Sequence, residues 1–78
     1  MDDLPNARGL FGQYANCLNV GYNAIEFVLD FGQYYPGEDA PQVALRIVTS
    51  PAYAKRFSAV LERALEDYVA SHGSVPEA

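Results

Sequence analysis

Strict alternation of apolar and other side chains in one stretch constrains the fold of this chain most. Between Ile25 and Gly32 every second residue is large and apolar, namely Ile25, Phe27, Leu29 and Phe31. A period of two residues over this length predicts a β-strand with one buried face. No catalytic or ligand-binding signature lies on this strand or elsewhere. The sequence therefore indicates an architecture and self-association, but no activity.

Two further strands are expected on either side of this one. Tyr14–Val20 forms a weaker strand pattern, and Gly21-Tyr22-Asn23 after it tolerates positive φ, which predicts a hairpin into Ile25–Gly32. Val43–Thr49 alternates again, and one of its faces carries Val43, Leu45 and Ile47. Short and moderate connections favour an antiparallel meander with Ile25–Gly32 in the middle.

A long helix is predicted to follow the third strand. Ser50 is a good N-cap and Pro51 suits the first helical position, where its missing N–H would be unpaired anyway. The helix should run from Pro51 to Ser71 or His72 and stop at Gly73 in the αL conformation. We therefore expect an α+β fold of order β-β-β-α over residues 14–73. Residues 1–13 would form a flexible arm that docks through Leu10 and Phe11, and residues 74–78 a flexible tail.

The apolar arc of this helix is wider than one small sheet requires. On a helical wheel it spans roughly 180°, against about 100° for a helix that packs on one partner. It is formed by Tyr53, Ala54, Phe57, Val60, Leu61, Ala64, Leu65, Tyr68 and Val69. Part of the arc should therefore face a second partner, and the second copy of this chain is the simplest one.

The charges of the helix oppose its own dipole, which an antiparallel pair of helices would compensate. Lys55 and Arg56 lie near its start and Glu66 and Asp67 near its end, and both opposite pairs are centred on Leu61. Around a two-fold axis, each basic residue would meet an acidic residue of the other copy. The expected interface comprises Lys55, Arg56, Leu61, Leu65, Glu66, Asp67 and Val69. The alternative is that these are ordinary solvated charges, which contribute little.

Composition excludes several classes of protein. A chain of 78 residues has a small core, and its lone Cys17 and lone His72 exclude an internal disulfide and leave too few ligands for a structural zinc site. Oligomerisation is the remaining common source of stability. The net charge of −5 disfavours nucleic acid and anionic membranes as partners. The chain shows no secretory or membrane-spanning stretch, so a cytoplasmic location and no cofactor are expected.

Three groups of residues could carry chemistry, and each has a simpler explanation. Glu26 and Asp30 lie on the same side of one strand but about 13 Å apart, beyond the roughly 5–9.5 Å of a glycosidase pair. One of them is more simply an ion-pair partner of Arg46 on the next strand. Cys17 and His72 lack a third, orienting group. The six tyrosines could stack nucleic-acid bases on a sheet, but the acidic balance favours a protein interface.

The order of several motifs resembles that of a known family. The motifs are, in chain order, Tyr14-x-Asn16, Val20, Glu26-Phe27-x-Leu29-Asp30-Phe31, Pro36-Gly37, Arg46-Ile47-Val48-Thr49-Ser50-Pro51 and Ala54-Lys55-Arg56. From Tyr14 to Gly73 the chain resembles a small bacterial family known only as a domain of unknown function (number thirty-four sixty-seven). That label implies no activity or site residue. More loosely, strands before a helix and the Glu26–Asp30 pattern resemble the export chaperone SecB, which implies an oligomeric binder of polypeptide.

These observations lead to one expected function and two alternatives. We expect a non-catalytic, homo-oligomeric interaction module, either an adaptor or a chaperone-like subunit that binds another protein. A nucleic-acid-associated accessory protein would instead use a tyrosine-bearing sheet, with Lys55, Arg56 and Arg63 on phosphates. An enzyme would need a pocket assembled across subunits, with Arg46, a tyrosine and a carboxylate converging in it.

Overall fold

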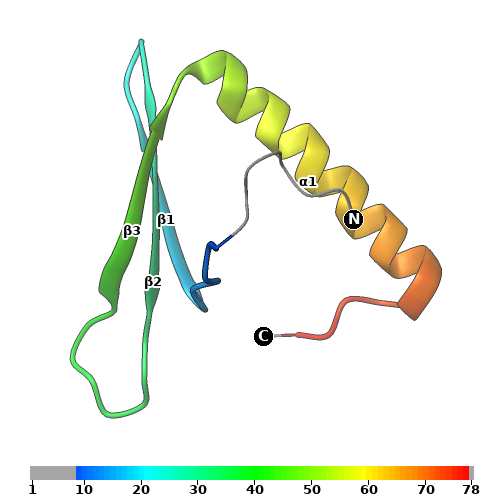
Figure 1. Ribbon diagram of the computed structural model, residues 1–78, viewed down its shortest axis with the longest axis horizontal. Helices are drawn as coiled ribbons and strands as arrows, with labels where there is room; N and C mark the ends of the chain where they lie inside the picture. Colours follow the sequence, from blue (N-terminus) through cyan, green and yellow to red (C-terminus); the bar gives the residue numbers. More distant parts are fainter. Residues whose placement is uncertain (1–8, 78) are drawn as a thin grey trace.

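A computed structural model describes residues 9–77 and shows three strands followed by one helix (Figure 1). The strands are β1 (Cys17–Tyr22), β2 (Phe27–Gln33) and β3 (Gln42–Thr49), and the helix is α1 (Pro51–His72). This confirms the predicted α+β class and the order β-β-β-α. Most of the predicted arm, residues 1–8, lies outside the described residues. Leu10 and Phe11, expected to dock, are 79% and 94% exposed.

The three strands form one antiparallel sheet of order β1-β2-β3, so the alternating strand is central, as predicted. In its register Leu29 lies between Val20 of β1 and Ile47 of β3. Paired residues share a face of the sheet, so the apolar positions of all three strands gather on one side. We call this side the apolar sheet face; it consists of Leu18, Val20, Tyr22, Phe27, Leu29, Phe31, Leu45 and Ile47.

The β1–β2 hairpin turns two residues later than predicted. Gly21 and Tyr22 belong to β1, and the connection begins at Asn23, whose side-chain oxygen accepts hydrogen bonds from the amides of Ile25 and Glu26, both at 2.9 Å. An asparagine side chain that accepts hydrogen bonds from amides two and three residues further on stabilises a turn. Ile25 therefore lies in the turn, is 77% exposed, and does not start the buried face as expected.

The chain before β1 is held to the sheet by one backbone hydrogen bond, from the Asn16 amide to the Gly32 carbonyl at 3.0 Å, and by side chains. Asn16 accepts the Tyr34 amide at 2.8 Å and donates to the Tyr34 carbonyl at 3.0 Å. Its side-chain amide thus reproduces the two bonds that a strand residue would make with its backbone. The predicted first strand, Tyr14–Val20, is wrong at its start for this reason, because Tyr14–Asn16 is attached without being part of β1.

A β-bulge interrupts the pairing of β2 with β3. Phe31 pairs with Leu45, but Gly32 pairs with Val43, so one residue of β3 has no partner. A Cβ atom on Gly32 would collide with the carbonyl oxygen of Gln42, so only glycine fits there. The shift places Val43 on the side of Asp30, whereas alternation predicted that it would share a face with Leu45 and Ile47.

Both predicted ends of the helix are confirmed, with one correction. The Ser50 hydroxyl accepts the Tyr53 amide at 3.2 Å, and Pro51 is the first helical residue. At the other end Gly73 has φ +86° and donates its amide to the carbonyl of Val69 at 2.9 Å. Its ψ of −166° lies outside the αL region, so the expected αL cap is instead a more extended glycine conformation.

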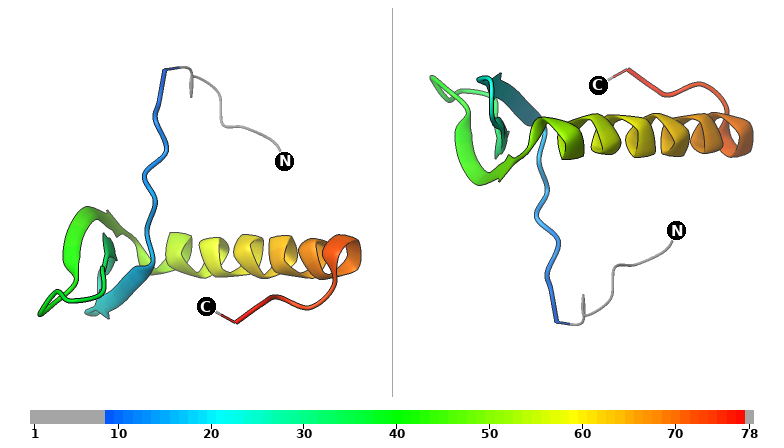
Figure 2. Two further views of the ribbon diagram at one scale, coloured as in Figure 1. Left: turned by 90° about the horizontal axis from the view of Figure 1, so that it is seen from below. Right: turned by 90° about the horizontal axis from the view of Figure 1, so that it is seen from above.

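The helix leaves the sheet instead of covering it. It makes few contacts with the strands, and Figure 1 and Figure 2 show it running from the end of β3 away from the sheet. No apolar side chain between residues 9 and 77 is buried. The expectation that the helix covers one sheet face is therefore wrong for the single chain. The sheet and the helix instead form the two arms of an open wedge.

Candidate functional site

A large concave feature within residues 9–77 is a groove between the sheet and the first half of α1. It has a volume of about 480 Å³ and opens widely to solvent. We call it the sheet–helix groove. Its sheet side is formed by Leu29, Phe31, Ile47 and Thr49, and its helix side by Tyr53, Arg56, Phe57 and Val60. The lining is apolar except for the Thr49 hydroxyl, the Tyr53 hydroxyl and the Arg56 guanidinium.

The helix side of this groove belongs to a longer exposed stripe. The stripe follows one side of α1 and consists of Tyr53, Phe57, Val60, Leu61, Leu65, Tyr68 and Val69; we call it the helix stripe. Each of these side chains is between 40% and 67% exposed. Completely burying one large apolar side chain contributes about 1.5–3 kcal/mol. Because these side chains are only partly buried, the stripe contributes much less to stability than it would if it were covered.

The tail that follows α1 returns toward this stripe. Val75 and Pro76 share a shallow groove with Leu61, Leu65 and Tyr68, and Figure 2 shows the tail turning back along the helix. The three helix residues remain 40–46% exposed with the tail in place. The tail therefore shields the stripe only in part.

All the residues expected at an interface lie on α1 and are exposed. Leu61, Leu65 and Val69 are on the helix stripe, each about half exposed. The charged members are Lys55, Arg56, Glu66 and Asp67, and only Arg56 lines the groove. Between residues 9 and 77 the sole ion pair joins Asp30 to Arg46, so none of these four charges is paired within that range. The two-fold arrangement stays a prediction.

The opposite face of the sheet carries that ion pair. Arg46 donates from Nε to Oδ1 of Asp30 at 2.7 Å and from an Nη to Oδ2 at 2.9 Å. This hydrogen bonding, together with the attraction of the guanidinium, lowers the pKa of Asp30, and partial desolvation opposes the change. The same bonding raises the pKa of Arg46. The predicted cross-strand pair is confirmed, and both of its groups are engaged in structure.

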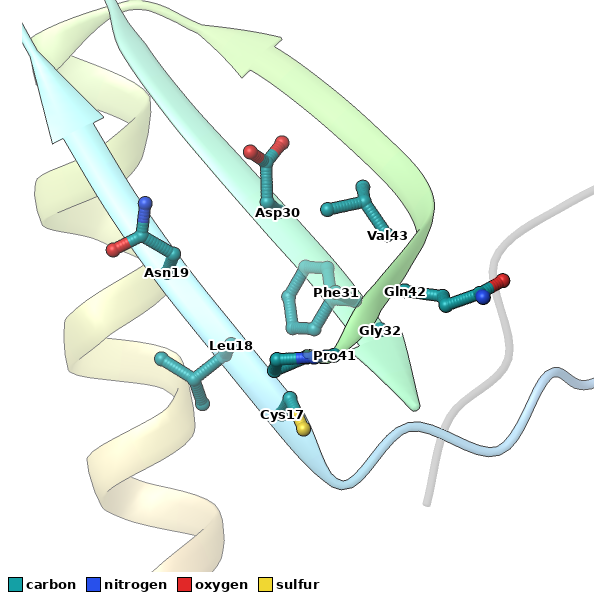
Figure 3. Close-up of a pocket in the computed structure, with 9 residues that line it drawn as sticks. All are labelled: Cys17, Leu18, Asn19, Asp30, Phe31, Gly32, Pro41, Gln42 and Val43. Carbon is teal, nitrogen blue, oxygen red and sulfur yellow. The ribbon is translucent and has the colours of Figure 1, made fainter. Parts of the chain in front are cut away.

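A small pocket lies beside Asp30 at the bulge (Figure 3). Its volume is about 220 Å³, and the register shift places Val43 of β3 next to Asp30. The rest of the lining comprises Cys17, Leu18, Asn19, Phe31, Gly32, Pro41 and Gln42. The Asp30 carboxylate at this pocket is bound to Arg46, and the other ionisable side chain of the lining is the Cys17 thiol.

The remaining candidate chemistry is dispersed. Glu26 lies in the turn before β2 instead of on the strand with Asp30. The Cys17 thiol donates to the side-chain oxygen of Asn16 at 3.4 Å, and the ring of His72 packs on Tyr68 with centroids 5.1 Å apart. Over residues 9–77 no three His, Cys, Asp or Glu side chains are grouped to hold a metal. Within the same part, no helix has the length and apolar character needed to cross a bilayer.

The tyrosines do not form one platform on the sheet. Only Tyr22 lies on a strand, where it stacks on Phe27 with centroids 5.6 Å apart. The Tyr34 hydroxyl donates to the Glu38 carbonyl and the Tyr35 hydroxyl to the side chain of Gln33, so both form hydrogen bonds within or beside the loop after β2. This distribution gives no support to the alternative in which a tyrosine-bearing sheet binds nucleic acid.

Sequence reasoning found both sides of the groove but not the groove itself. Leu29 and Ile47 were expected on the apolar faces of their strands, and Phe57 and Val60 on the apolar arc of the helix; all four line the groove. Thr49 and Tyr53 were not expected to face each other across an opening. The one available signal was the apolar arc of the helix, which spans roughly 180° where a helix packed on one sheet needs about 100°.

Comparison with known proteins gives one result. The model of a family described as "Protein of unknown function (DUF3467)" matches residues 3–77, in agreement with the resemblance seen in the motifs. No curated protein and no solved structure matches the chain. The looser similarity to SecB is therefore not supported.

Proposed function

Since the chain belongs to the DUF3467 family, whose description names no activity, we propose its function from its own geometry. We infer that it is the subunit of a homo-oligomer that acts as a non-catalytic interaction module. The observation that carries this proposal is the uncovered apolar wedge formed by the apolar sheet face and the helix stripe. The surface left after self-assembly would bind another protein, as an adaptor does.

The exposed apolar area of the wedge supports the proposal that it binds a partner. With about 200 Å² for a fully exposed aromatic side chain and about 100 Å² for an aliphatic one, the exposed fractions correspond to on the order of 800 Å² of apolar surface. The largest apolar patch of a typical monomer is about 300–600 Å². A standard protein interface buries about 800 Å² on each partner. The wedge therefore has the area of one side of a stable interface.

The energetic scale leads to the same proposal. At about 25 cal/mol per Å², covering 800 Å² contributes roughly 20 kcal/mol before the costs of association. The net stability of a whole domain is about 5–15 kcal/mol. A three-stranded sheet is stable when its apolar face packs against another element. Assembly supplies that element for this chain.

The pairing of the polar groups supports a role without catalysis. Asp30 and Arg46 bind each other, and Cys17 and His72 have separate neighbours. No two of these groups form an acid–base or nucleophile–base pair. We also propose a cytoplasmic location, because one unpaired cysteine suits a reducing compartment.

The experiment is a measurement of mass and folding over a range of protein concentrations. Light scattering after size exclusion should give a dimer or larger species, and Val60→Asp should reduce that mass because Val60 lines the groove. Ala59→Asp is the matched control, since it adds the same charge to the neighbouring residue outside the stripe. Wild-type protein that is a folded monomer at every concentration, by scattering and circular dichroism, would refute the proposal.

A further inference from the structure

We propose that the sheet–helix groove is the seat for the C-terminal half of α1 from a second copy of this chain, lying antiparallel to the helix that forms the groove. This inference rests on the proposed homo-oligomer and names which surface meets which. Each subunit would offer a groove at the start of its helix and fill the other groove with the end of its helix. The result is a closed, two-fold dimer.

The chemistry of the groove specifies the occupant. It is apolar on both sides and carries one cation, Arg56, which has no carboxylate partner between residues 9 and 77. A fitting occupant presents large apolar side chains with a carboxylate beside them. The C-terminal half of α1 has this character, because Leu65 and Tyr68 are exposed next to Asp67.

The spacing of charges fixes the register of the pair. Arg56 and Asp67 lie on the same flank of the helix stripe and at nearly equal distances from Leu61 on either side. A two-fold axis at Leu61 therefore brings Arg56 of each copy to Asp67 of the other. On the opposite flank the same axis brings Lys55 to Glu66. All four unpaired charges of the expected interface acquire opposite partners in one arrangement.

The tail does not fill this seat. Val75 and Pro76 line a shallow groove with the C-terminal half of the stripe, whereas the sheet–helix groove is formed at the N-terminal half. The stripe residues under the tail are still 40–46% exposed. Apolar surface thus remains open at both ends of the helix, as a reciprocal arrangement requires.

Charge reversal in two separate proteins tests the register. In Arg56→Asp each contact between the copies would bring two carboxylates together, and in Asp67→Arg it would bring two guanidinium groups together. Each variant alone should dissociate more readily, by about ten-fold or more in dissociation constant for two reversed contacts. An equimolar mixture should restore both attractive contacts, because each copy then supplies what the other lacks.

Native mass spectrometry distinguishes the three dimers in that mixture by mass. We expect the heterodimer well above its statistical proportion at low salt, with the excess declining as salt screens the charges. A single chain carrying both R56D and D67R should dimerise like the wild type. Arg63→Asp is the matched control, since it makes the same change of charge at a residue that would lie level with Ala59 of the other copy.

The outcomes separate this inference from the proposed function. If both single variants dimerise like the wild type and mix statistically, the inference is overturned while the homo-oligomer stands. If the wild type is a monomer, both are overturned. If a single variant is unfolded alone and folds when mixed with the other, the inference is supported, because complementation then requires the reciprocal contact.

Discussion

The substitution Gly32→Ala tests the structural account of the bulge. A Cβ atom at this position would collide with the carbonyl oxygen of Gln42 and would lie 3.0 Å from the carbonyl carbon of the same residue. Both atoms belong to the backbone of β3, so a side-chain rotation cannot relieve the collision. Overpacking of this kind costs about 1–3 kcal/mol. We expect urea denaturation at a fixed protein concentration to show a loss of that size.

Gly21→Ala is the matched control in the same sheet. Gly21 lies in β1 without positive φ, and a Cβ atom there meets no atom within 4 Å. Since glycine in a strand is less stable than alanine by roughly 0.5–1 kcal/mol, this variant should be neutral or slightly more stable. If the two variants have the same free energy of unfolding, the close approach of Gln42 to Gly32 does not constrain the fold.

Three further predictions follow from local geometry. The ion pair lowers the pKa of Asp30 in the folded chain. The pair therefore stabilises the fold at pH values above the ordinary Asp pKa of about 3.9, and this stabilisation is lost as the pH falls through the lowered pKa. The free energy of unfolding of Asp30→Asn should approach that of the wild type only in acid. Ser50→Ala should cost about 1 kcal/mol in thermal or urea unfolding through loss of the N-cap, and Ser58→Ala, inside the exposed helix, should cost nothing. In a background without the native cysteine, Leu61→Cys should form a disulfide between two copies under mild oxidation and Ala59→Cys should not; equal cross-linking of the two would place the two-fold axis elsewhere.

Much of this fold follows from local patterns in the sequence. Alternation at Phe27–Phe31 predicted the central strand, and Ser50-Pro51 and Gly73 predicted both ends of the helix. The ion pair of Asp30 with Arg46 was also anticipated, because two carboxylates and one arginine faced each other across neighbouring strands. Each of these features depends on residues that are close in sequence or paired in a simple hairpin.

The wrong strand predictions lie where a side chain makes hydrogen bonds usual for a backbone, or where a backbone atom from another strand restricts a residue. Beyond one backbone bond to Gly32, Asn16 is attached to Tyr34 by its side-chain amide, so the weak strand pattern from Tyr14 extended the strand past its true start at Cys17. The carbonyl of Gln42 approaches Gly32 only in the assembled sheet, so alternation assigned Val43 to the wrong face. The angle between the sheet and the helix is set at the Thr49–Pro51 junction, where β3 ends and α1 begins. No periodic pattern of side chains encodes that angle, and the groove was therefore missed.

The position of Asp30 has a consequence for how the chain avoids misfolding. It is charged, and its exposed fraction is only 9%. A slip of β3 by two residues along β2 would keep an alternating pattern but would set Ala44 or Val48 opposite Asp30 in place of Arg46. The carboxylate would then lose its charged partner, a cost that apolar contacts do not offset. Between residues 9 and 77 no apolar side chain is buried, so apolar packing distinguishes the registers of β2 and β3 only weakly. The ion pair of Asp30 with Arg46 thus favours the native register over one shifted by two residues.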